Sequence, residues 1–86
     1  MHLCSRSVNI MNKDIHIPAD IGDIVRSARK AQKLRQYELA GASGVGLRFI
    51  IDLEAGKPTA QIGKALQVLR ALGCAVTVKT PDDQMP

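Results

Sequence analysis

Two short segments with helical apolar spacing, joined by a glycine, constrain the fold of this chain more than any other feature. The first spans residues 36–43 and the second spans residues 47–55. Gly44 stands between them, and its freedom to adopt left-handed backbone angles permits a tight turn. Gly56, followed by lysine and proline, ends the second segment, because proline cannot continue a helix. The pattern therefore predicts a hairpin of two short helices.

The small and apolar residues of this hairpin have the spacing that a helix-turn-helix requires. Ala40 is small where the two helices cross, and Val45 fills the gap behind the turn. At about 100° per residue, Ile50 and Leu53 fall on the inner side of the second helix, with Phe49 at its edge. We therefore expect a helix-turn-helix, a motif whose second helix enters the major groove of double-stranded DNA.

The outward face of the second helix is the predicted base-reading surface. It consists of Leu47, Arg48, Ile51, Asp52 and Ala55. An arginine can donate two hydrogen bonds to guanine, so Arg48 is the leading candidate for base recognition, with a phosphate contact or a solvated surface cation as the alternative. Leu47 and Ile51 are unusual on such a face. They indicate either contact with thymine methyl groups or a surface that binds protein instead of DNA.

Further DNA contacts are expected beside this helix. Gln36 and Tyr37 open the first helix of the hairpin, where amides approach the DNA backbone, and Gln36 is also placed to hold an adenine edge or to brace Arg48. Lys57 follows the second helix and is expected at a phosphate. The expected electrostatic contributors upstream are Arg29, Lys30, Lys33 and Arg35. The complete set of predicted DNA-binding residues is Arg35, Gln36, Tyr37, Gly46, Leu47, Arg48, Ile51, Asp52 and Lys57.

Two longer amphipathic segments flank the hairpin. Pro18 suits the first turn of a helix that runs to about residue 32. Its apolar face consists of Ile21, Ile24, Val25 and Ala28. Thr59 is placed to cap a fourth helix that ends at Gly73. The apolar positions of that helix are Ile62, Ala65, Leu66, Leu69 and Leu72.

After this fourth helix the residue pattern changes from helical spacing to that of a β-strand. Residues 74–79 are rich in β-branched side chains and place Cys74, Val76 and Val78 on one side of an extended segment. A lone strand cannot satisfy its own backbone, and the same strand of a second copy is a better partner than residues 15–17. We therefore expect an all-α helix-turn-helix domain of four to five helices, with a short C-terminal β-strand that pairs across a homodimer.

The predicted organisation is one domain with short extensions. Residues 1–17 are an N-terminal extension, flexible or a short strand, and residues 18–73 are the helix-turn-helix domain. Residues 74–79 are the dimerisation strand, and residues 80–86 are a flexible tail.

Composition limits the class of protein further. The 86 residues carry a formal net charge of +4, which favours an anionic partner, and only 2% are aromatic, so the core has to be aliphatic. No apolar run reaches the ~18 residues of a membrane span and no leader is evident, so we expect a cytoplasmic protein. The spacing of His2, Cys4, His16 and Cys74 matches no zinc site. Enzyme activity, metals and cofactors are not expected.

Three runs of the sequence carry a resemblance to a known family. They are RKAQKLRQYELA, GVGLRFIIDLEAGKPT and IGKALQVLRALG. Within residues 21–73 the chain resembles the Cro/repressor-type (XRE) helix-turn-helix family, and HipB-like antitoxins in particular. The resemblance implies a lambda-repressor-like fold, a dimer with paired C-terminal strands, and binding to palindromic operators ahead of its own operon. It also implies restraint of a HipA-like serine/threonine kinase toxin.

Three positions depart from the pattern of that family, among them Ser43, which stands where a small apolar residue is common. Arg35 stands where a threonine usually caps the first hairpin helix, so a cap is lost while a cation gains access to phosphate. Gly46 replaces the usual serine cap of the second helix, a milder change of about a few tenths of a kcal/mol.

The sequence leaves three functions to compare. The first is an antitoxin and repressor paired with a kinase toxin, and the second is a free-standing repressor, which the neighbouring gene would distinguish. The third is an adaptor that binds a protein partner through Leu47, Phe49 and Ile51. DNA binding that falls steeply with salt would contradict the adaptor.

Overall fold

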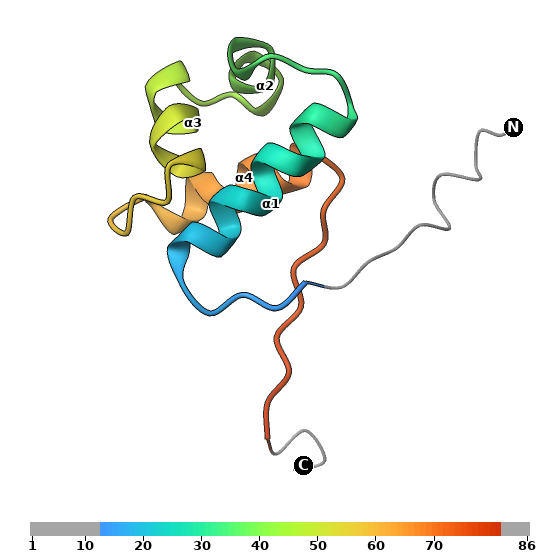
Figure 1. Cartoon of the computed structure of the whole chain (residues 1–86), viewed down its shortest axis with the longest axis vertical. Coiled ribbons are helices and arrows are strands. Elements are labelled where there is room, and N and C mark those ends of the chain that lie inside the picture. Colours follow the sequence, from blue (N-terminus) through green and yellow to red (C-terminus); the bar gives the residue numbers. More distant parts are fainter. Residues whose placement is uncertain (1–12, 82–86) are drawn as a thin grey trace, which may run out of the picture.

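Four helices form a bundle in the part of the chain that the structure describes. The computed structural model describes residues 13–81, and the predictions for residues 1–12 and 82–86, including His2 and Cys4, lie outside that range. Within it, the helices are α1 (Pro18–Ala31), α2 (Gln36–Ser43), α3 (Leu47–Glu54) and α4 (Ile62–Ala71). In Figure 1, α1 crosses in front of α4, and α2 and α3 lie above these two helices. None of the described helices is both long and apolar enough to span a membrane.

The start of α1 follows its sequence closely. Pro18 occupies the first helical turn, as expected. The carboxylate of Asp20 accepts hydrogen bonds from the backbone amides of His16 (2.8 Å) and Ile17 (3.1 Å). These bonds favour the charged carboxylate, so they hold the pKa of Asp20 below its ordinary value. Asp20 therefore satisfies two amide groups in front of the helix, where no side chain at the cap position does so.

The tight turn between α2 and α3 confirms the predicted hairpin. Gly44 has φ 77° and ψ 26°, the left-handed conformation that glycine adopts without steric cost. The amides of Gly44 and Val45 both donate to the carbonyl oxygen of Ala40, at 3.0 and 3.1 Å. The side-chain amide of Gln67, in α4, donates to the carbonyl oxygen of Ser43 at 2.7 Å. A distant residue thus completes the end of α2.

The core is aliphatic, as composition requires, and all four helices contribute to it. Its buried members are Val25, Leu39, Ala40, Ile50, Leu53, Ala65, Val68, Leu69 and Leu72. Helix α3 packs against both α1 and α2, and α2 also packs against α4. The short helix α3 is therefore held from two sides, which fixes the direction of its outer face.

The prediction for the start of α4 is wrong. The helix begins at Ile62, with Gln61 rather than Thr59 at the cap position. Residues 57–60 form a turn instead, in which the amide of Ala60 donates to the carbonyl oxygen of Lys57 at 3.4 Å, and Ala60 packs against the core. The chain thus reaches the core at the partly buried Ala60, and α4 begins only two residues later.

The predicted apolar face of α4 is right only in part. Val68 is fully buried, whereas Ile62 is 68% exposed and Leu66 is 38% exposed. The helix carries apolar residues on more than one side, and contact with α2 selects which side is inside. Ile62 and Leu66 therefore remain exposed on the side of α4 that faces away from the core.

The predicted C-terminal strand does not form in this single chain. The amide of Cys74 donates to the carbonyl oxygen of Leu69 at 2.9 Å, and residues 75–80 then run away from the bundle without regular secondary structure (Figure 1). Because a strand needs a neighbour for its backbone groups, one copy of the segment has no ladder to join. Pairing between two copies therefore stays a prediction.

Helices α1 and α3 approach each other backbone to backbone at a glycine. A Cβ atom added to Gly22 would collide with the carbonyl oxygen of Leu53 and would lie 3.0 Å from that of Glu54. Gly56, at φ 84°, adds a second close approach, because its Cβ would lie 3.0 Å from the Cα of Ala19. Gly22 therefore sets the distance between α1 and the end of α3.

Substitution of Gly22 tests this close approach. We expect Gly22→Ala to lower the free energy of unfolding by about 1 to 3 kcal/mol, because overpacking forces the two backbones apart. Gly63→Ala is the matched control, since a Cβ there meets nothing within 4 Å. That change should leave stability unchanged or raise it by up to about 1 kcal/mol. Urea unfolding measures both, and equal effects would contradict the close contact.

Candidate nucleic-acid interface

Helix α3 separates its residues into a buried face and an open face. Ile50 is fully buried and Leu53 is 3% exposed, as predicted. Leu47 is 45% exposed, and the side chain of Arg48 is 81% exposed. Ile51 and Asp52 are half-buried at the margins of the open face, and Ala55 is exposed just past the helix. The hairpin thus holds the open face of α3 toward solvent.

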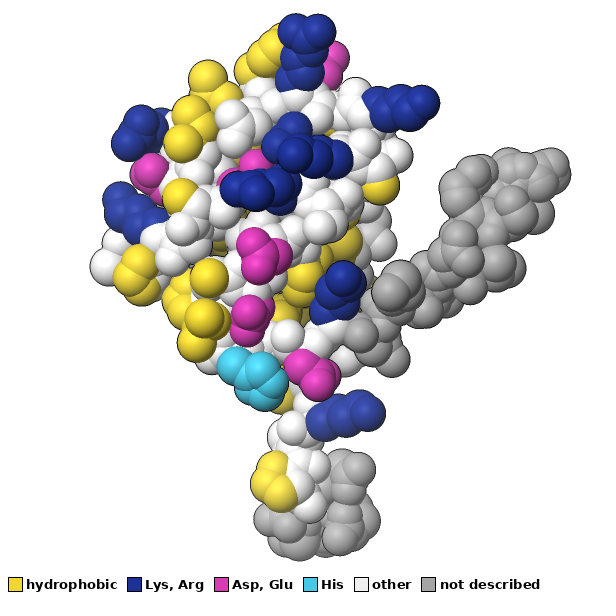
Figure 2. Space-filling view, in the orientation of Figure 1, with side chains coloured by type: hydrophobic (Ala, Val, Ile, Leu, Met, Phe, Trp, Pro, Cys, Tyr) yellow, Lys and Arg dark blue, Asp and Glu magenta, His cyan; other side chains and the backbone are white. Residues whose placement is uncertain are grey.

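Asp52 joins the two cations of this face. Its carboxylate lies 3.3 Å from Nε of Arg48 and 3.5 Å from Nζ of Lys57. Figure 2 shows dark-blue basic side chains and an acidic one in sequence along the edge of the molecule that α3 forms. Exposed ion pairs of this kind contribute about 0 to 1 kcal/mol. Both cations can therefore exchange this carboxylate for an anionic partner at little cost.

A buried ion pair fixes the far end of α3. Nε and Nη2 of Arg29 donate to the two carboxylate oxygens of Glu54, at 2.7 and 3.0 Å. Nη1 of Arg29 also donates to the carbonyl oxygen of Leu34, at 2.8 Å, and Gln36 donates to Glu54 at 3.2 Å. Among the described residues, no buried side-chain nitrogen or oxygen lacks a partner. The network joins α1, the α1–α2 connection, α2 and α3.

This network corrects two predictions. Arg29 is not an electrostatic contributor at the surface, because its side chain is only 11% exposed and is paired with Glu54. Gln36 does not brace Arg48, because its amide is directed to Glu54 instead. Both residues hold the end of α3 through Glu54.

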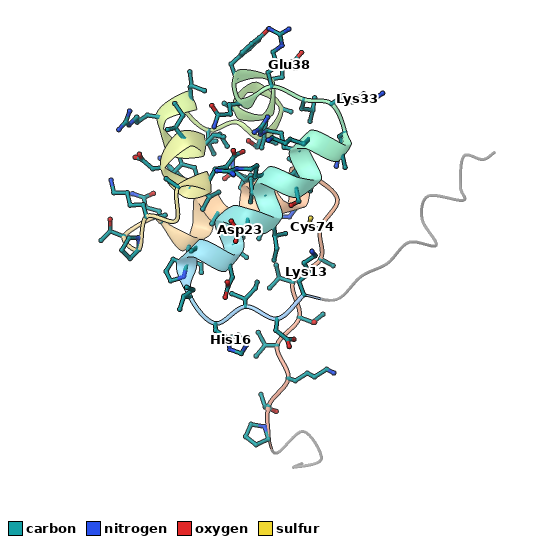
Figure 3. The ribbon with its side chains drawn as sticks, viewed as in Figure 1. Lys13, His16, Asp23, Lys33, Glu38 and Cys74 are labelled. Atoms are coloured by element: carbon teal, nitrogen blue, oxygen red, sulfur yellow. The ribbon has the colours of Figure 1, made fainter. Side chains whose placement is uncertain are left out.

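The start of α2 forms one flank of the open face. Arg35 and Tyr37 are exposed there, and Gln36 is half-buried. As expected, Arg35 provides no side-chain cap, and its own amide donates to the carboxylate of Glu38 at 2.7 Å. Figure 3 places Lys33 at the connection from α1 to α2, away from α3, so its charge lies outside the open face.

Gly46 and Lys57 border α3 at its two ends. Gly46 is exposed at the N-cap position of α3, with extended backbone and no side-chain cap, as its sequence position predicts. Lys57 is exposed just past the helix and pairs with Asp52. The structure thus brings together most of the predicted DNA-binding residues, while Cys74, Val76 and Val78 lie in the C-terminal segment beyond α4.

An exposed second helix, supported by a first helix across a glycine turn, defines a helix-turn-helix protein. A helix-turn-helix family model, HTH_3, matches residues 25–78. The HTH-type transcriptional regulator y4mF of Sinorhizobium fredii (strain NBRC 101917 / NGR234) is 65% identical over 74 residues, which cover 86% of this chain and 97% of the relative. The chain belongs to the XRE-type helix-turn-helix family and is a helix-turn-helix transcriptional regulator.

Solved structures share the fold. A chain of the HipB-O4 20mer complex superposes with a TM-score of 0.73 at 18% identity, covering 83% of this chain and 100% of that chain. A chain of the HipA-HipB-O2-O3 complex gives the same TM-score, identity and coverage. The predicted likeness to HipB is therefore confirmed at the level of the fold.

The buried ion pair can be tested by removing its acidic member. We expect Glu54→Ala to lower the free energy of unfolding by about 3 to 5 kcal/mol, because Arg29 would be left as an uncompensated buried charge. Asp52→Ala, which removes a half-buried carboxylate paired only with exposed cations of the surface, should change stability by less than about 1 kcal/mol. Urea unfolding of the two variants compares them. A loss in Glu54→Ala no larger than in Asp52→Ala would show that the pair does not hold α3.

Proposed function

We propose that this chain is a cytoplasmic repressor that reads a palindromic operator as a homodimer, with α3 in the major groove. The observation that carries the proposal is the exposure of Arg48 and Leu47 on a helix whose other side is locked into the core. An α-helix is about 10 to 12 Å across, and the major groove is about 12 Å wide. The open face of α3 therefore fits a groove without rearrangement of the bundle.

The open face offers chemistry that distinguishes bases. Arg48 is suited to donate to O6 and N7 of guanine, and Leu47 with the exposed part of Ile51 to contact thymine methyl groups. Asp52 is suited to accept from the N4 amine of cytosine, beside the arginine that it orients. At the flanks, Arg35, Gln36, Tyr37, Gly46 and Lys57 are assigned to the sugar-phosphate backbone.

Two substitutions separate base reading from phosphate binding. We expect Arg48→Ala to lose about 1 to 3 kcal/mol on duplexes selected from a random pool, with relaxed base preference, because a bidentate contact to one base is lost. Lys57→Ala should weaken selected and random duplexes by the same factor. Equilibrium binding measured at several salt concentrations compares the variants. Equal loss on both kinds of duplex in Arg48→Ala would contradict its base-reading role.

The same measurement tests DNA binding itself. A chain that binds duplex DNA through phosphates loses affinity steeply as salt rises. Absence of binding to any duplex by the intact protein would instead favour an adaptor that uses Leu47, Phe49 and Ile51 on a protein partner.

A strip of exposed apolar side chains supports the homodimer. Ile62 and Leu66 are one turn apart on the open side of α4. Ile62 lines a hollow with Ile15 and Ile17, and Leu66 lines another with Cys74 and Val76. The strip thus runs from the segment before α1, across α4, to the C-terminal segment that includes Val78. A second copy that pairs along residues 74–79 would cover it and give the strand its missing neighbour.

Dimerisation and DNA reading should be separable. We expect Val76→Asp to move the protein toward monomer in sedimentation experiments and to weaken operator binding, because a charge enters the apolar strip. Leu47→Gln should stay dimeric and lose only DNA affinity. In the dimer, the two copies of α3 should lie about 34 Å apart and protect half-sites about 10 base pairs between centres. A monomeric wild type would contradict the proposal.

We further propose that the chain is the antitoxin of a HipA-like serine/threonine kinase toxin. Support comes from the HipB-like sequence runs and from the fold shared with a chain of the HipA-HipB-O2-O3 complex. Co-expression with the product of the neighbouring gene tests the pairing. A kinase that co-purifies and loses toxicity would support the antitoxin, whereas an unrelated neighbour that does not bind would favour a free-standing repressor.

A further inference from the structure

Lys64 is held against α3 by an aromatic ring. Its ammonium nitrogen lies 5.9 Å from the centroid of the Phe49 ring, within the range of a cation–π interaction. Lys64 belongs to the first turns of α4 and is exposed, whereas Phe49 is half-buried in α3 and packs against the core. The ring therefore places a cation of another helix beside the N-terminal half of α3, the half that meets bases in this kind of motif.

Lys64 and the start of α2 lie on different sides of α3. Glu54, which receives the hydrogen bond from Gln36 of α2, is five residues after Phe49. Five residues correspond to roughly 140° around a helix axis, given 3.6 residues per turn. The outer face of α3 is thus bordered by α2 on one side and by Lys64 on the other.

The charge of Lys64 is uncompensated, unlike the other cations at α3. Arg48 and Lys57 share the carboxylate of Asp52. Within residues 13–81, Lys64 forms no salt bridge, and the sequence from residue 55 to residue 81 contains no aspartate or glutamate. An anion that approaches this side of α3 meets a free ammonium group and no nearby carboxylate on the same stretch of chain.

We infer that Lys64 binds a DNA phosphate on the strand opposite the one that the start of α2 approaches. The inference rests on the proposed insertion of α3 into a major groove, which has a phosphate backbone along each wall. A helix that nearly fills the groove brings its two flanks to the two walls. Phe49 restrains the ammonium group before binding, so less side-chain freedom is lost when the phosphate is bound.

The experiment measures the salt dependence of binding to a random-sequence duplex of about 30 base pairs, long enough for two half-sites. We expect Lys64→Ala to lower the slope of log affinity against log salt by about 0.9 per subunit, the value of one phosphate contact. Lys64→Arg should keep the wild-type slope. Lys13→Ala is the matched control, because it removes the same side chain and charge at a site that Figure 3 places away from α2 and α3.

The outcomes separate this inference from the proposed function. No binding by the wild type would overturn the proposed function. Wild-type binding with an unchanged slope in Lys64→Ala, or with an equal decrease in Lys13→Ala, would overturn the phosphate contact alone.

Phe49→Leu keeps apolar packing but removes the ring, so Lys64→Ala should cost less affinity in that background than in the wild type. Equal cost in both backgrounds would overturn the role of Phe49 as a positioning residue.

Discussion

Glu54 is the acceptor at which three parts of the bundle meet. Arg29 from α1 binds it with two hydrogen bonds and Gln36 from α2 adds a third, so the end of α3 is held against both helices. A buried carboxylate is costly unless its lone pairs are satisfied, and here they are. Because α3 has only eight residues, fixing its end fixes the direction of Arg48 as well. The open face of α3 depends on this pair more than on the propensity of its own sequence for helix.

Local chemistry made the hairpin predictable. The turn at Gly44, the small Ala40 at the crossing and the inner pair Ile50 and Leu53 follow from spacing along a single stretch of chain. The division of α3 into an inner and an outer face follows from the same periodicity. These features involve residues at most a few turns apart, so one sequence suffices to predict them.

Interactions between distant segments were not predictable in this way. The sequence predicts Arg29 to be an electrostatic contributor to DNA binding, but its partner Glu54 lies 25 residues further along the chain. The bond from Gln67 to the end of α2 spans 24 residues, and the bond from Gln32 to the carbonyl oxygen of Leu72 spans 40 residues. The sequence around Gly22 does not indicate that a Cβ is excluded there, because the close contact is with the backbone of Leu53 and Glu54 in α3. The spacing of residues along one helix does not indicate which distant residues will pack against it.

The carboxylate of Asp52, which lies between Arg48 and Lys57, has a consequence for how the proposed repressor would search a chromosome. In the proposed complex, a negative charge facing the groove would weaken attraction to phosphates in general, so encounters with other sequences would end sooner. At a matching site, the proposed base reading would let Arg48 exchange Asp52 for a guanine edge and would free the carboxylate for a cytosine amine. Discrimination then comes from short residence everywhere else as much as from tight attachment at the target.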